Sequence, residues 1–118
     1  MQEVILKDFI KVSTNKIYES KSWFYRKKIK DDYAKWFLEY KSKFNKIDDP
    51  VHIEFDFYFK SHSLDCSNVS FMAKMIEDCL VSNKILVDDN NCWVKSVKYS
   101  SQKSNDKTTY CILKLIPD

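Results

Sequence analysis

The chain has 118 residues, of which 44% are hydrophobic and 15% aromatic, and it carries a formal net charge of +3. This composition is typical of a globular domain and argues against a disordered chain, and no apolar run approaches the roughly 20 residues that a membrane-spanning helix needs. The N-terminus lacks the charged start and long apolar stretch of a secretory signal. We therefore expect a single cytoplasmic domain over residues 1–118, with no membrane partner and no small-molecule cofactor.

The first part of the chain predicts a strand, a loop and a helix. Residues 3–10 are β-branched and apolar, which favours a strand. Residues 11–23 show no clear period and predict a long basic loop. Aromatic residues then recur at steps of three and four over about residues 26–44, which is the spacing of an amphipathic helix. Pro50 marks the break after this helix, because proline cannot continue it.

The middle of the chain predicts a strand followed by a second helix. Residues 51–59 alternate apolar and polar side chains, which is the clearest strand pattern in the sequence. An apolar stripe predicts a helix over about residues 68–80. Ser67 is expected as its N-cap, and Asn83 is expected at the position where glycine usually ends a helix.

The end of the chain predicts two strands, over residues 92–100 and 109–117, joined as a hairpin by the polar residues 101–108. The resulting order β-α-β-α-β-β predicts an α+β fold, in which two main helices pack on a small mixed β-sheet. Because the sequence contains no glycine, positions with positive φ are expected to fall to Asn or Asp.

Positive charge is concentrated near the N-terminus. Residues 11–30 contain seven basic side chains and one acid, Glu19. Such asymmetry suits a segment that binds a polyanion such as nucleic acid, although lysines on a solvated loop would give the same count. The neighbouring aromatic residues Trp23, Phe24 and Tyr25 could either stack on open bases or pack at the start of the helix.

Acidic residues lie at both ends of the second predicted helix. Asp65 and Ser67 precede it, and Asp88 and Asp89 follow it. The helix is about 20 Å long, and the residues after it, at ~3.3 Å each, are enough to run back along it. If the carboxylates meet, they suit a hard cation such as Mg²⁺, which activates water at a phosphodiester. The same residues also suit a helix start and an ordinary turn, so both interpretations stay open.

Three segments carry a resemblance to a known family. "STNKIY" (residues 13–18) resembles a motif S-x-N-x-x-Y, with "KV" where prolines usually precede it. "PVHIEFDFYF" and "LDCSN" (residues 50–59 and 64–68) resemble a strand leading into a D-x-D-N helix start, and "ILVDD" (residues 85–89) resembles an acidic pair after the helix. In this order, and over nearly the whole chain, the segments resemble the RusA-type Holliday-junction resolvases that bacteriophages and prophages carry.

The resemblance implies a homodimeric endonuclease that cuts four-way or branched DNA with Mg²⁺, or Mn²⁺ in its place, during phage recombination, replication or packaging in the host cytoplasm. By position, Asp65 and Asp89 correspond to catalytic residues of the family and would hold the metal together with Asp88. Asn68 is the amide of the helix-start motif and has a supporting role.

Two positions depart from the family pattern. Ser67 stands where the second aspartate is expected, and it would leave the metal site one charge short. Phe71 stands at the place of the catalytic helix lysine, so we expect Lys74, one turn further on, to take that role.

The resemblance and the basic segment together predict a set of DNA-binding residues. Their side chains would grip phosphates without reading bases. The set consists of Lys11, Asn15, Lys16, Tyr18, Lys21, Arg26, Lys27 and Lys28.

Three functions follow from the sequence. The first is a Mg²⁺-dependent junction resolvase. The second is a junction-binding protein of the same fold whose cleavage is weakened or lost because Ser67 replaces a metal-binding aspartate. The third is a small interaction protein in which the acidic residues are only caps and turns.

Overall fold

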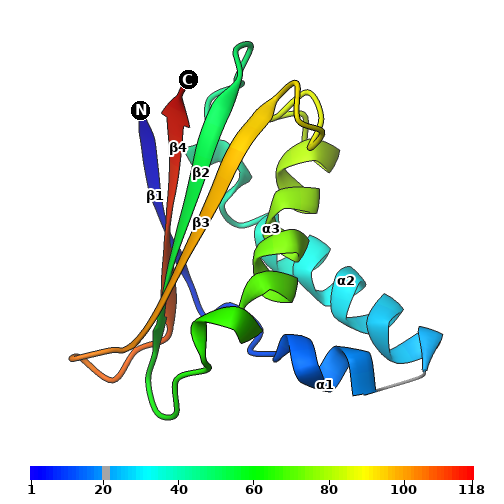
Figure 1. The fold of residues 1–118 in the computed structure, drawn as a ribbon, viewed down its shortest axis with the longest axis vertical. Coiled ribbons are helices and arrows are strands. Elements are labelled where there is room, and N and C mark those ends of the chain that lie inside the picture. Colours follow the sequence, from blue (N-terminus) through cyan, green and yellow to red (C-terminus); the bar gives the residue numbers. More distant parts are fainter. Residues whose placement is uncertain (20–21) are drawn as a thin grey trace.

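A computed structural model describes residues 1–19 and 22–118 of the chain. Three helices cover one face of a four-stranded mixed sheet (Figure 1). The prediction of an α+β fold with a mixed sheet is confirmed, but the predicted order lacked one helix. The elements are β1 (Gln2–Lys7), α1 (Thr14–Glu19), α2 (Trp23–Phe37), η1 (Lys41–Lys43), β2 (Val51–Phe59), η2 (Cys66–Asn68), α3 (Ser70–Ser82), β3 (Val94–Lys103) and β4 (Tyr110–Pro117).

Strand β2 builds the core, because its alternation turns every second side chain toward the helices. Phe55 and Phe57 on this strand are fully buried, as are Tyr33 of α2 and Met72 and Ile76 of α3. Burying a side chain of this size contributes about 1.5–3 kcal/mol. No helix in the described part of the chain is long and apolar enough to cross a membrane.

The predicted hairpin between the last two strands is wrong. The sheet order is β1-β4-β2-β3, so β4 lies between β1 and β2 and is antiparallel to both, whereas β3 is parallel to β2. The burial of Cys111, Leu113 and Leu115 explains the inner position of β4, while the serine- and lysine-rich β3 forms an edge. The predicted loop 101–108 is shorter than expected, because β3 continues along β2 to Lys103.

The segment predicted as a long basic loop contains helix α1. The hydroxyl of Ser13 accepts a hydrogen bond from the backbone N–H of Lys16 at 3.0 Å, and Ile17 is buried. Tertiary burial of one side chain therefore stabilises a helix that has no amphipathic period of its own.

Helix α2 begins earlier and ends earlier than predicted. Its last residue is Phe37, and the chain then turns into η1. Tyr40 and Phe44 nevertheless stay buried, and the hydroxyl of Tyr40 accepts from the backbone N–H of Lys7 at 3.0 Å. The aromatic spacing thus continues to mark the core after the helix has ended.

Helix α3 is close to its predicted position, but its caps differ. Ser67 does not cap it; Val69 holds the N-cap position without a side-chain hydrogen bond. Asn83 is the C-cap with a negative φ, and Lys84 takes the positive φ that was expected at Asn83. Of the residues with positive φ in the described ranges, Asp8 fits the expectation, whereas Lys84 and Lys107 do not.

Candidate functional site

Two of the three motif segments meet at the start of α3. The backbone N–H of Asn15 donates to the side-chain oxygen of Asn68 at 3.3 Å. The hydroxyl of Thr14 accepts from the backbone N–H of Phe71 at 3.0 Å and lies 3.0 Å from the hydroxyl of Ser70. The structure therefore brings the predicted residues Asn15 and Asn68 together, and Thr14 supplies the helix cap that was expected from Ser67.

The third motif segment, residues 85–89, contacts α3 at Lys74, one turn after the start of the helix. The ammonium of Lys74 contacts a carboxylate oxygen of Asp89 and lies 3.3 Å from a carboxylate oxygen of Asp78. The hydrogen bond from Lys74 holds the pKa of Asp89 below its ordinary value, and the same bond raises the pKa of Lys74. Asp78 was not predicted, although its position four residues after Lys74 is the usual spacing of a helical ion pair.

Glu77 lies beside this cluster and is buried. Burial raises the pKa of its carboxyl, and the charges of Asp89 and Asp78 raise it further, while Lys74 lowers it. One ammonium therefore faces three acidic side chains, of which Asp78 and Asp89 contact it directly. We call Lys74, Glu77, Asp78 and Asp89 the acidic cluster.

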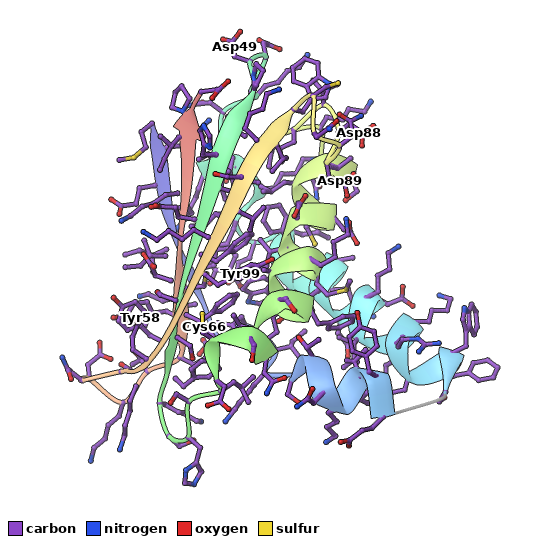
Figure 2. The ribbon with its side chains drawn as sticks, in the orientation of Figure 1. Asp49, Tyr58, Cys66, Asp88, Asp89 and Tyr99 are labelled. Atoms are coloured by element: carbon purple, nitrogen blue, oxygen red, sulfur yellow. The ribbon has the colours of Figure 1, made fainter. Side chains whose placement is uncertain are left out.

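Asp88 and Asp65 lie apart from one another. The carboxylate of Asp88 accepts from the backbone N–H of Asp89 at 2.7 Å and from the side chain of Asn90 at 3.2 Å, which closes the loop. Asp65 holds the N-cap position of η2, where its side chain makes no cap bond. Figure 2 shows the neighbouring Cys66 and the pair Asp88–Asp89 near opposite ends of α3.

These positions do not fit a shared metal site. The expected ligands Asp65, Asp88 and Asp89 do not converge, and the carboxylate of Asp89 already holds an ammonium. In residues 1–19 and 22–118, no group of three or more His, Cys, Asp or Glu is arranged to hold a metal ion. Ser67 is exposed near Asp65 and adds no charge there. We derive no catalytic step through Mg²⁺ from this arrangement.

The predicted DNA-binding cations have different surroundings. Lys11 donates to the backbone carbonyl of His62, and its ammonium lies 5.4 Å from the centre of the Phe59 ring. Lys27 and Lys28 pair with Asp31 and Asp32 at 2.9 and 2.8 Å. Such exposed pairs are worth little and can exchange for a phosphate.

Of the other predicted DNA-binding residues, those that the structure describes are exposed on α1 and α2. Lys16 and Arg26 form no ion pair in the described part of the chain. Tyr18 is exposed at the end of α1. Lys21 lies outside the described residues.

A groove between α2 and α3 gathers several of these cations. Its volume is about 450 Å³, and its lining consists of Trp23, Arg26, Lys27, Lys30, Asp31, Phe71 and Met75. We call this the α2–α3 groove. A second cavity of about 270 Å³ shares Lys30 and Met75 with it and reaches Asp78 and Asp89 of the acidic cluster. Lys30 was not among the predicted binding residues, although its spacing from Arg26 puts both on one side of α2.

Two of the three aromatic residues at the start of α2 are not packed into the core. The side chains of Trp23 and Phe24 are 58% and 77% exposed, and their ring centres lie 5.2 Å apart in an edge-to-face arrangement. Tyr25 is half-buried and packs against the core. Of the two alternatives, packing against the core therefore holds for Tyr25 only.

No family model matches the chain, and no curated protein or solved structure matches it either. The resemblance to RusA-type resolvases accordingly rests on the three motif segments.

Proposed function

We propose that the chain binds branched DNA through the α2–α3 groove. The observation that carries this proposal is the convergence of Arg26, Lys27 and Lys30 on one groove that also has aromatic and thioether walls. Cations beside exposed rings are the side chains that proteins use to hold nucleic acid strands.

The spacing of the cations supports a nucleic acid as the ligand. Arg26 and Lys30 are one helical turn apart, which is about 6 Å along the axis. Each nucleotide of a strand carries one phosphate, so two cations separated in this way can contact two different phosphates of the same strand. Lys27 lies between them, and its exposed pair with Asp31 offers little resistance to exchange.

The preference for a branch rests on the resemblance and on the exposed rings. In a continuous duplex the faces of the bases are stacked on one another, whereas a branch point leaves some of them open. Exposed aromatic side chains beside the cations can stack on the open bases of a branch point, but not on the covered bases of a continuous duplex. A homodimer would match the two-fold symmetry of a four-way junction, and sedimentation at micromolar concentration tests that part of the proposal.

A titration with a synthetic four-way junction and a linear duplex of equal length tests the proposal. We expect tighter binding to the junction and a fall in affinity between about 50 and 200 mM salt, with a logarithmic slope near −3 for three phosphate contacts. Arg26→Gln should reduce the slope by about one. Lys35→Gln, an exposed lysine of α2 that does not line the groove, is the matched control. Equal affinity for both DNAs, or a slope near zero, would contradict the proposal.

Mg²⁺-dependent cleavage of the bound junction is a second candidate function. The contact between Lys74 and Asp89 brings together two residues that were expected to be catalytic, although the same contact occupies the carboxylate that was expected to bind the metal. The assay is cleavage of a labelled junction with Mg²⁺ by wild type, Asp65→Asn and Ser67→Asp. Symmetrical nicks that disappear in Asp65→Asn would support a resolvase. Binding without product would support a junction-binding protein, and product in Ser67→Asp alone would identify the missing carboxylate as the cause.

A further inference from the structure

We infer that Trp23, backed by Phe24, is a stacking site for unpaired bases of a single-stranded DNA segment that lies in the α2–α3 groove. This inference rests on the proposed DNA binding and specifies which part of the DNA the groove takes. It concerns how the bases are held, whereas the salt-dependent affinity of the proposed function depends on the phosphates.

The two rings occupy positions that the core does not use. The buried side chains of α2 are Ile29, Tyr33 and Phe37, which follow one stripe of the helix. Trp23 lies off this stripe, lines the groove and contacts Phe24 edge-to-face. A stacking platform needs a ring that is held in place while one face stays open, and a neighbouring ring supplies that support.

The groove combines the two kinds of surface that a nucleotide needs. Phe71 and Met75 of α3 supply an apolar wall, and Arg26 and Lys30 of α2 supply positive charge within the same lining. Its volume of about 450 Å³ lies in the range of sites that hold a small organic ligand. Each nucleotide of a single strand presents a flat apolar base face and a charged phosphate, which matches this combination.

The ligand is a single strand rather than a duplex or an acidic peptide. In a duplex the base faces are covered by their neighbours, so Trp23 could reach only the sugar-phosphate backbone. An acidic peptide would use the cations of the groove but would leave the exposed ring of Trp23 without a partner. Charge complementarity and ring exposure together therefore favour unpaired nucleotides.

The test compares a 12-mer of thymidine with an abasic oligonucleotide of the same length and charge, binding the full chain. We expect the thymidine 12-mer to bind about tenfold more tightly, because stacking on one ring contributes on the order of a tenfold gain. Trp23→Leu should remove most of this difference and Trp23→Phe should keep it, since phenylalanine retains a π-face. Leu38→Ala is the matched control, because Leu38 is an exposed apolar side chain directly after the same helix and outside the groove.

Binding of the four-way junction is measured in parallel, so that the two proposals fail separately. Equal affinity for the thymidine and abasic oligonucleotides, with junction binding intact, would overturn the stacking site alone. The same would follow if Trp23→Leu bound the thymidine 12-mer as wild type does, or if a polyglutamate peptide competed as well as the 12-mer. Absence of all DNA binding would overturn the proposed function and the stacking site with it. Because Trp23 is mostly exposed, its variants are expected to fold, and thermal melting checks this.

Discussion

Replacing Lys74 by glutamine removes the ammonium that holds the acidic cluster together. At neutral pH, Asp78 and Asp89 would then face each other and Glu77 without a counter-charge. The side chain of Lys74 is 50% exposed and those of both aspartates are 30% exposed. Solvent therefore screens both pairs, and each is worth at most about 1 kcal/mol. We expect Lys74→Gln to lower the free energy of unfolding by about 1 kcal/mol.

The stability that Lys74→Gln removes should depend on pH, and the direction of this dependence follows from the pKa of Asp89. The pKa of Asp89 is lowered by the hydrogen bond from Lys74, so its contribution to stability is present above the ordinary aspartate pKa and is lost as the pH falls through the lowered value. The cost of Lys74→Gln should therefore be full at about pH 7 and smaller at about pH 2, because the Asp89 carboxylate loses its charge as the pH falls through its lowered pKa.

Urea unfolding of wild type and Lys74→Gln at these two pH values is the assay. Lys35→Gln serves as the control, because this exposed lysine of α2 has no acidic partner in the described ranges. An equal loss of stability at both pH values would mean that Lys74 acts through packing of its stem, and the electrostatic reasoning would be wrong.

Two further predictions concern α3. Burial raises the pKa of Glu77, so its ionised form destabilises the fold as the pH rises through that raised value; Glu77→Gln should raise the melting temperature at neutral pH and have little effect in acid. Thr14→Val removes the acceptor of the Phe71 N–H and should cost about 1 kcal/mol in chemical denaturation, as loss of a helix cap does, whereas Thr14→Ser should keep most of that stability.

The sequence correctly predicted those elements in which one face is buried, because burial of one face gives the residues a regular apolar period. Strand β2 matches its prediction because each of its odd-numbered residues faces the helices. The sheet order could not be read in the same way, since the pairing of β4 with both β1 and β2 depends on contacts far apart in the chain. The polar composition of β3 was a usable signal for an edge strand. Helix α1 escaped prediction because its stability comes from contacts of Ile17 and Thr14 with other elements.

The candidate site was predictable only in part, because its geometry also depends on contacts between residues far apart in the chain. Chain length allowed residues 83–89 to run back along α3, but length is only an upper limit on reach. The backbone N–H groups of Ile85 and Leu86 bond to the carbonyl of Leu80, and both side chains are buried at the end of α3. Only the last few residues of the loop are left to turn back. They carry Asp89 to Lys74, which lies about 12 Å before the end of the helix, and not to Asp65.

The α2–α3 groove and the acidic cluster influence each other because their cavities share Lys30 and Met75. A phosphate held by Lys30 would approach the carboxylates of Asp78 and Asp89, which repel it. The ammonium of Lys74 offsets one of these two charges. If the proposed binding holds, we expect a strand to lie along Arg26 and Trp23 and away from the acidic cluster. Lys74→Gln should therefore weaken DNA binding at low salt even though Lys74 does not line the groove, and the effect should fade as salt screens the repulsion.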